Sequence, residues 1–257
     1  MKRAARIATF ASAVAFLLSA AVLAPPAIAD QSGPTPYPTR PEDWPGEGVI
    51  RVFGWMNDNR NFFWSERDKK RGSIVFAGDS LTGNWKTLGK DLSKDLPGVG
   101  IANRGIGGDV SRGLLFRFQE DVLALHPQAI VMLIGINDLT ARQPATVTLA
   151  NIRTMLEMKR TQQPDVPVVL CTVPPSANPK APIDERQRKF LNQGLRQLAK
   201  ENPRVSLVDL YAAMVTSEGI PDRRYFQSDQ LHFSAAGHER WKQLLLPALR
   251  EAGALQP

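Results

Sequence analysis

The sequence predicts an α/β fold in which a parallel sheet of five strands is covered by helices on both faces. From residue 73 onward, short apolar segments alternate with segments of helical periodicity. Strands are expected at 73–78, 98–103, 129–135, 166–173 and 205–210. Helices are expected near 82–95, 110–124, 144–162, 184–201 and 235–252. Repeated βαβ units of this size form parallel sheets through right-handed crossovers.

The chain length bounds the domain organisation. With 257 residues, 43% of them hydrophobic, the chain is long enough for one well-cored domain and too short for two. Residues 1–29 are expected to be a signal peptide, because Lys2, Arg3 and Arg6 begin it and the small-x-small site Ala27-Ile-Ala29 ends it. We therefore expect an exported protein, periplasmic or secreted, with no membrane span after the signal is removed.

Charge and cysteine content narrow the function classes. The signal peptide removes three of the 32 basic residues and none of the 25 acidic ones, so the net charge falls from +7 to +4. This mild charge gives no basic footprint for a nucleic acid. Cys171 is the only cysteine, so the chain has no internal disulfide. Its place in an apolar run indicates a buried, unreactive thiol.

Two segments precede the first strand. Residues 30–49 are rich in proline and are expected to form an extended N-terminal arm, which leaves the folded domain at 50–257. Residues 51–71 are expected to be helical. The aromatic side chains of this helix that we expect to pack inward are Trp55, Phe62, Phe63 and Trp64.

The stretch Gly78-Asp79-Ser80 directly follows the first expected strand. In an open α/β sheet, ligands bind at the carboxyl ends of the strands, so Ser80 lies where a nucleophile is expected. Taken alone, these residues also suit an ordinary turn in which Ser80 is the N-cap of the next helix. Segments farther along the chain favour the nucleophile.

Two glycine-containing segments follow the next two strands. The glycines of Asn103-Arg-Gly-Ile-Gly-Gly-Asp109 allow backbone amides to approach a ligand closely. In Gly135-Ile-Asn-Asp138, Asn137 can offer a side-chain amide. Asp109 and Asp138 are expected to be helix N-caps. The first segment has neither the Gly-x-Gly-x-x-Gly spacing of a dinucleotide loop nor the Gly-Lys-Ser/Thr of a P-loop.

The chain has three histidines, and one of them is placed for base catalysis. His126 lies at the amino end of the third strand, the wrong edge of the sheet, and His238 lies inside the last helix. His232 precedes that helix, and Asp229 lies three residues earlier. One turn of chain can bring this carboxylate to the imidazole Nδ1. It would then stabilise the imidazolium formed when Nε2 takes a proton from Ser80.

Together these segments resemble the SGNH/GDSL hydrolase family of GDSL-type esterases and lipases. Four blocks match in the family's order: Gly78-Asp-Ser-Leu81, Gly105-Ile-Gly-Gly-Asp109, Gly135-Ile-Asn-Asp138 and Asp229-Gln-Leu-His232. The segment 103–112 looks most like the platelet-activating-factor acetylhydrolase branch and its bacterial esterase relatives. The resemblance covers roughly residues 50–252. It implies that 50–257 is an SGNH hydrolase domain, a flavodoxin-like three-layer α/β/α sandwich.

The resemblance also implies a role for each site residue. Ser80 would be the nucleophile, His232 the base and Asp229 the carboxylate that orients the base. The backbone N–H groups of Ser80 and Gly108 and the side chain of Asn137 would form the oxyanion hole. Acyl transfer to water requires neither a metal nor a cofactor, and none is expected.

Export and the resemblance favour short acyl groups, especially acetyl esters of carbohydrates or small lipids. Lysophospholipid or thioester substrates stay open, as does a non-catalytic exported binding protein on the same fold. The sequence leaves open whether four residues line the pocket: Trp85, Arg223, Arg224 and Tyr225. The alternative is core packing for Trp85 and solvated loop charges for the arginines.

A metal-dependent phosphoesterase is the remaining alternative. Its ligands would come from Asp79, Asn137, Asp138, Asp229 and His232. With three histidines in the chain, a dinuclear site would be short of ligands, so we disfavour this reading.

Overall fold

The computed structural model describes residues 32–255. The expected signal peptide, residues 1–29, lies outside this range and stays a prediction. The described helices and strands belong to the compact unit Gly33–Pro257. Within residues 32–255, no helix is both long enough and apolar enough to cross a membrane.

Five parallel strands form one sheet in the order β2-β1-β3-β4-β5. They are β1 (Ile74–Gly78), β2 (Ile101–Gly105), β3 (Ala129–Leu133), β4 (Val168–Cys171) and β5 (Val205–Val208). This is the flavodoxin-like order, and it confirms the predicted parallel sheet. Gly78, the last residue of β1, pairs with Gly105 on one side and Leu133 on the other. The ends of the three strands therefore lie side by side at the carboxyl edge.

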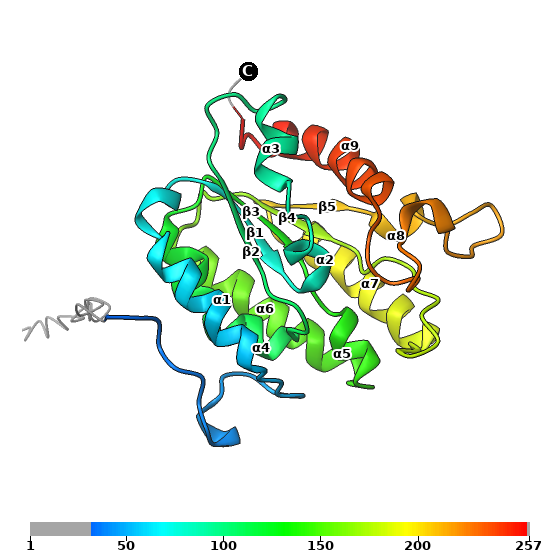
Figure 1. Cartoon of the computed structure of the whole chain (residues 1–257), viewed down its shortest axis with the longest axis horizontal. Coiled ribbons are helices and arrows are strands. Elements are labelled where there is room, and N and C mark those ends of the chain that lie inside the picture. The colour runs from blue at the N-terminus through cyan, green and yellow to red at the C-terminus, as the bar shows by residue number, and fades with distance from the viewer. Residues whose placement is uncertain (1–31, 256–257) are drawn as a thin grey trace, which may run out of the picture. The chain divides into compact units, whose positions relative to one another are not determined.

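Helices cover both faces of the sheet, which gives the three-layer sandwich that the family resemblance implies (Figure 1). One face carries α3 (Leu88–Ser93) and α9 (Ala235–Glu251). The other carries α4 (Ser111–Asp121), α6 (Ala145–Gln162) and α7 (Glu185–Glu201), with α1 (Gly54–Ser65) against α4. Short helices follow three strand ends: α2 (Ser80–Gly83), α5 (Ile136–Thr140) and α8 (Leu210–Ala213). Single 3-10 turns lie at Pro41–Asp43, Asp68–Lys70, Leu123–Leu125 and Arg223–Tyr225.

Several element boundaries differ from the prediction. β2 begins at Ile101 rather than residue 98, because Gly98 adopts φ +78° in a turn before the strand. The helix expected near 82–95 is divided into α2 and α3. The helix expected over 51–71 ends at Ser65, and a 3-10 turn follows it. Gly72 ends this region with φ +70°, a conformation that suits glycine.

The core lies on both faces of the sheet, and all residues of β1 and β3 are buried. Such strands read as continuous apolar runs, as expected for a sheet covered on both faces. Cys171 is buried in β4, and burial raises the pKa of its thiol to about 12, so the sulfur is inert at neutral pH.

The arm ahead of α1 lies against α4. The guanidinium of Arg112, on α4, donates to the arm's backbone carbonyls at Pro41, Trp44, Pro45 and Gly48. Tyr37 and Trp44 of the arm stack with ring centroids 5.5 Å apart, and both rings contact Phe116 of α4. Arginine and aromatic contacts together therefore fix the arm to the domain.

This arm also reaches the loop that follows β2. Tyr37 and Trp44 share a small apolar cluster with Met56 of α1 and with Ile106. Met56 and Ile106 are completely buried. Ile106 directly follows β2, so the arm and α1 support the same loop in which an oxyanion-hole residue is expected.

Candidate active site

Ser80 lies at the carboxyl edge of the sheet. β1 ends at Gly78, and Asp79 is the N-cap of α2, because its Oδ1 accepts from the Leu81 N–H at 2.9 Å. Ser80 is therefore the first residue of the helix and not its cap. Its side chain is half-buried at the place where a ligand is expected to bind.

The structure brings His232 and Asp229 to Ser80. The Ser80 Oγ is 2.9 Å from Nε2 of His232, although the two residues are 152 positions apart in the chain. Nδ1 of the same ring is 2.5 Å from Oδ2 of Asp229. Serine, imidazole and carboxylate thus form one hydrogen-bonded chain, the arrangement that removes a proton from a serine hydroxyl.

Asp229 is held in its charged form. Partial burial raises the pKa of this carboxyl, but hydrogen bonds from the His232 ring and from the Leu231 and His232 N–H groups outweigh it. The net effect is a pKa below its usual value. The carboxylate is therefore ionised at neutral pH and available to stabilise an imidazolium.

The loop that carries this pair is anchored at Gln230, which adopts φ +57°. The Gln230 carbonyl accepts from the Ala177 N–H at 3.1 Å and from Ser176 Oγ at 3.2 Å. The His232 carbonyl accepts from the Gln227 N–H at 2.8 Å. The two bonds to Gln230 fix the loop on the segment after β4, and the bond to Gln227 closes the loop on itself.

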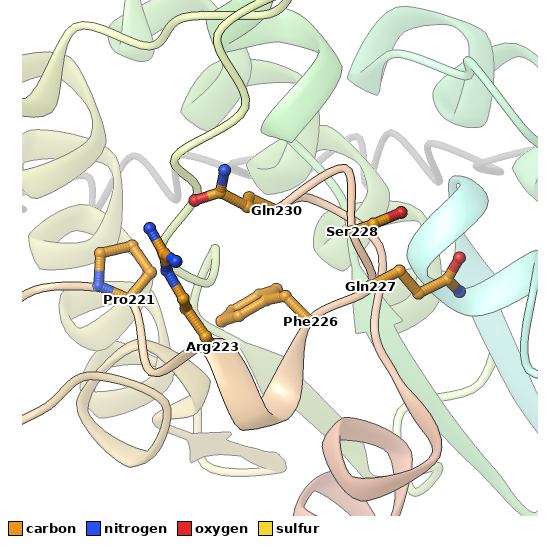
Figure 2. Close-up of a pocket in the computed structure, with 6 residues that line it drawn as sticks. All are labelled: Pro221, Arg223, Phe226, Gln227, Ser228 and Gln230. Carbon is orange, nitrogen blue, oxygen red and sulfur yellow. The ribbon is translucent and has the colours of Figure 1, made fainter.

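A cavity of about 220 Å³ adjoins this loop. Figure 2 shows the side chains of Pro221, Arg223, Phe226 and Gln230 around it. Arg223 thus lines a pocket, whereas Arg224 forms an ion pair with Asp222 at 2.6 Å. Among the four residues whose roles the sequence did not decide, Arg223 is the one that lines this cavity.

Trp85 and His238 belong to the packing beneath α9. Trp85 is 2% exposed, donates to Asp91 at 2.6 Å and stacks on the His238 ring with centroids 4.9 Å apart. Burial lowers the pKa of His238, so this imidazole is neutral at physiological pH. His238 therefore has a packing role, as its place inside a helix predicts.

The loop after β2 lies against Ser80. A Cβ atom added to Gly107 would stand 3.9 Å from the Ser80 Cβ. Gly108 adopts φ +85°, a conformation that L side chains rarely take, so the turn requires glycine here. The Asn137 side chain comes from the segment after β3 and donates to the Asp109 carbonyl at 2.9 Å. One of its two amide hydrogens is thereby fixed, and the residue is oriented beside this loop.

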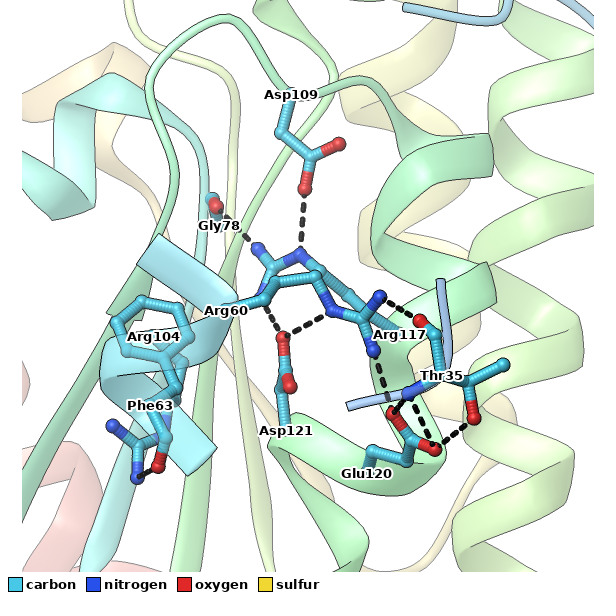
Figure 3. A network of polar contacts seen from close by, with 9 residues as sticks. All are labelled: Thr35, Arg60, Phe63, Gly78, Arg104, Asp109, Arg117, Glu120 and Asp121. Atoms are coloured by element: carbon cyan, nitrogen blue, oxygen red, sulfur yellow. Dashed lines mark hydrogen bonds and ion pairs between the residues drawn. The ribbon is translucent and has the colours of Figure 1, made fainter. Parts of the chain in front are cut away.

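A buried ion network lies beneath the loop (Figure 3). Arg117 of α4 donates to Asp109 at 2.8 Å, to Asp121 at 3.2 Å and to the Gly78 carbonyl at 3.0 Å. The Arg117 and Asp109 side chains are both 0% exposed. One guanidinium therefore joins the end of β1 to the end of the loop after β2.

A second arginine extends the network to the arm. Arg60 of α1 pairs with Glu120 at 2.6 Å and donates to the Thr35 carbonyl at 2.5 Å. Glu120 also accepts from the Thr35 N–H at 3.1 Å. No local pattern in the sequence indicated these partners, because they come from the arm, α1 and α4.

Two aspartates predicted to be helix N-caps have other roles. Asp109 accepts from Arg117, and the N-cap of α4 is Val110. Asp138 lies inside α5 and accepts from the Ser111 N–H at 3.0 Å and from Gln143 at 2.8 Å. Both predictions were wrong, because in a buried setting a carboxylate takes several donors from distant elements rather than one local N–H.

Asp79 is a buried carboxyl near the site with few hydrogen-bond partners. It is 0% exposed, and among residues 32–255 its Oδ2 has no hydrogen-bond partner. Burial, with Asp109 and Asp138 nearby, raises its pKa to about 8, against the effect of the Leu81 N–H. Asp79 is therefore largely protonated at neutral pH, which keeps a negative charge away from Ser80.

The geometry can also be compared with the metal-dependent alternative. Within the described part of the chain, no group of three or more His, Cys, Asp or Glu side chains is placed to hold a metal ion. Asp138 is committed to Ser111, Thr148 and Gln143, and Asp229 is committed to His232. The residues named for a metal site are thus divided among separate hydrogen-bond groups.

Comparison with known protein families shows which family the chain belongs to. Residues 73–240 match the model of the GDSL-like lipase/acylhydrolase family, a span that contains Ser80, Gly108, Asn137, Asp229 and His232. The chain belongs to this family. A comparison with curated proteins gave no match.

Solved structures of GDSL hydrolases share the fold. A GDSL-like lipase from Bacteroides thetaiotaomicron is 28% identical, with a TM-score of 0.65 over 74% of this chain and 97% of its own. A lipase/acylhydrolase from Enterococcus faecalis is 27% identical, with a TM-score of 0.59 over 72% and 97%. An acetyl xylan esterase, 22% identical, has a TM-score of 0.59 over 69% and 99%, and shows the same fold. As a GDSL acylhydrolase, the chain is a carboxylic ester hydrolase.

Proposed function

We propose that this GDSL hydrolase is an exported serine esterase that cleaves short-acyl esters, with acetyl as the preferred acyl group, through Ser80, His232 and Asp229. The observation that carries the proposal is the 2.9 Å contact between Ser80 Oγ and His232 Nε2. His232 takes the hydroxyl proton as Oγ attacks the ester carbonyl carbon, and Asp229 stabilises the resulting imidazolium. The carbonyl electron pair moves onto its oxygen.

The second half of the cycle uses the same groups. When the tetrahedral intermediate collapses, the alcohol leaves with the proton from His232 and the acyl group stays on Ser80. Water then attacks the acyl carbon and gives its proton to His232. Collapse of the second intermediate releases the acid and returns the proton to Ser80.

The oxyanion is proposed to bind the backbone N–H groups of Ser80 and Gly108 and the Asn137 amide. Two features support this assignment. The loop of Gly108 lies against Ser80, and the Asp109 carbonyl holds Asn137 beside it. Each such donor contributes about 3 kcal/mol when it is aimed at the developing charge. Protonation of Asp79 also favours the oxyanion, because an ionised carboxylate at that place would repel the negative charge.

One comparison supports a short acyl group. The fold is that of an acetyl xylan esterase, which supports acetyl esters of carbohydrates. Lysophospholipid and thioester hydrolysis are the alternatives that a chain-length series separates from this proposal.

The test is hydrolysis of ethyl acetate, butyrate, octanoate and an acyl thioester by the mature protein and by Ser80→Ala, with and without EDTA. We expect turnover that is highest for acetate, insensitive to EDTA and lost in the folded variant. Full activity in Ser80→Ala would refute the assignment of Ser80 as the nucleophile. A preference for octanoate would refute acetyl as the preferred acyl group. Loss of turnover in EDTA would favour the metal-dependent alternative.

Export is proposed on residues 1–29 alone. If these residues are a cleaved signal, protein expressed from the full reading frame should appear outside the cytoplasm with Asp30 as its first residue. Mass spectrometry of the intact protein measures this. A cytoplasmic product that still begins at Met1 would contradict export without affecting the esterase assignment.

A further inference from the structure

Three aromatic side chains on α1 or directly before it lie on the surface. Trp55 is 51% exposed, Phe62 is 62% exposed and Phe53 is 38% exposed. Trp55 and Phe62 were predicted to pack inward. The inward face of α1 is instead filled by Met56, Arg60 and Phe63. Large apolar side chains grouped on a surface mark a place where a ligand or partner binds.

Phe53 and Trp55 form a fixed pair beside the nucleophile. Their rings stack with centroids 4.5 Å apart and planes 15° apart. The Trp55 Nε1 donates to the Gly107 carbonyl at 2.9 Å. A Cβ on Gly107 would be 3.9 Å from the Ser80 Cβ and 4.0 Å from Trp55 Nε1, so the indole and the nucleophile flank the same glycine. The pair is thus a rigid, open aromatic surface at the mouth of the site.

The same helix continues from this pair into a groove. Trp55, Asn59, Phe62 and Glu66 are spaced four, three and four residues apart, which places them on one side of α1. Asn59, Phe62 and Glu66 line a cavity of about 350 Å³. Its other walls include Gly83 at the end of α2, Lys86 just after it, and Asn103 and Gly105 on β2.

We propose that this face of α1 is the binding surface for a glycan chain whose ester is presented to Ser80. The inference rests on the proposed esterase and names its substrate. Aromatic faces pack on the C–H faces of sugar rings, while amide, carboxylate and ammonium groups meet the hydroxyls. This side of α1 alternates the two kinds of group.

The same alternation disfavours a lipid chain. An acyl tail lying in the groove would take Asn59, Glu66 and Lys86 out of water without offering them hydrogen bonds. A glycan replaces those bonds with its hydroxyls. Phe53 and Trp55 would hold the sugar that carries the ester. Phe62 lies about 10 Å farther along the helix axis and would contact a sugar farther along the chain.

The test compares an ester without rings with acetylated oligosaccharides of one to six sugars. Ethyl acetate serves as the small substrate, since the ring of a nitrophenyl ester could itself stack on Trp55. Trp55→Ala should lower the ratio of kcat/KM for the hexasaccharide ester to that for ethyl acetate about tenfold, through KM. Trp55→Phe should restore most of this ratio, because it keeps an aromatic face. Phe62→Ala should raise KM only for the longer oligosaccharides.

Phe190→Ala is the matched control, since Phe190 is 49% exposed on α7 and lies outside the groove. Calorimetry with the inactive Ser80→Ala protein gives a readout independent of turnover. It should bind the acetylated hexasaccharide and lose that binding when Trp55→Ala is added.

Unchanged selectivity in Trp55→Ala, or no glycan binding by Ser80→Ala, would overturn the proposed glycan surface without affecting the proposed esterase activity. If Trp55→Ala weakened binding to phospholipid vesicles more than binding to glycans, the ligand of this surface would be a lipid rather than a glycan. Absence of turnover of any ester would refute the proposed function itself.

Discussion

The two halves of the active site are held in place in different ways. Ser80 and the loop after β2 stand on a completely buried network in which Arg117 joins Asp109, Asp121 and the end of β1. The loop of Asp229 and His232 lies beyond the sheet, with these side chains 38% and 24% exposed. It is held by hydrogen bonds to its own backbone and to the segment after β4. We therefore expect the stability of the fold to depend on the buried half with Ser80. Substitutions in the exposed half with Asp229 and His232 should cost little stability.

The largest expected effect is on the exposed half. His232→Ala should lower kcat by about four to six orders of magnitude, because Ser80 loses its base. The melting temperature should change by less than about 4 °C, since the ring is partly exposed and closes no core contact. Steady-state kinetics and thermal unfolding measure the two quantities. A large fall in both would show that the loop supports the fold and would remove the contrast.

The buried half should respond in the opposite way. Arg117→Ala leaves Asp109 and Asp121 buried without their main partner, and we expect a loss of about 3–5 kcal/mol in the free energy of unfolding. Chemical denaturation measures this loss. Arg186→Ala is the matched control, because Arg186 is 91% exposed and its pair with Asp184 should contribute less than about 1 kcal/mol. Equal destabilisation in the two variants would show that the network contributes little.

Asp79 gives the buried half a pH dependence. Its pKa of about 8 in the folded state exceeds that of an exposed aspartate, so the folded protein binds this proton more tightly than the unfolded chain does. Stability from this group is therefore present at low pH and is lost as pH rises toward about 8, at about 1.4 kcal/mol per pH unit. Asp79→Asn should remove this slope, so its stability relative to wild type should increase between about pH 5 and pH 8. Parallel stability curves for the two proteins would show that Asp79 stays ionised.

The smallest expected effect tests the anchor of the exposed half. Ser176→Ala removes one of two donors to the Gln230 carbonyl, while the Ala177 N–H remains. The loss of one hydrogen bond of this kind costs about 1 kcal/mol, so kcat should fall by no more than about fivefold, and stability should change by no more than that amount. A fall approaching that of His232→Ala would mean that this single bond sets the position of the base.

Sequence reasoning reached the exposed half more easily than the buried one. Asp229 and His232 are three residues apart and form a local motif. In the buried half, Ser80 was predictable as well, because it follows a recognisable strand. The partners of Asp109 are different in kind, because Arg117 lies on the next helix and Asn137 lies after another strand. Local rules therefore predicted a helix cap at Asp109, whereas tertiary packing made it part of an ion network.

The sheet was predictable for a related reason. Strands buried on both faces are continuous apolar runs, so all five were found, although most of their ends are shifted by one to three residues. The largest shift is at the start of β2, which follows the turn at Gly98. The exposed aromatic residues of α1 show the limit of this reasoning. Hydrophobicity alone predicts burial for Trp55 and Phe62, and no local pattern distinguishes a packing residue from one that faces a ligand.

The arm ahead of α1 has a consequence for the order in which the molecule is completed. A ribosome makes residues 33–49 well before three of their partners. Arg112, Phe116 and Glu120 come 64 to 85 residues after the arm residues they contact. The arm therefore lacks these three partners until α4 has formed. Segments that close such long loops gain their contacts late in folding. The first part of the described chain to be synthesised is thus expected to be among the last to dock, and its docking completes the support beneath the catalytic loop.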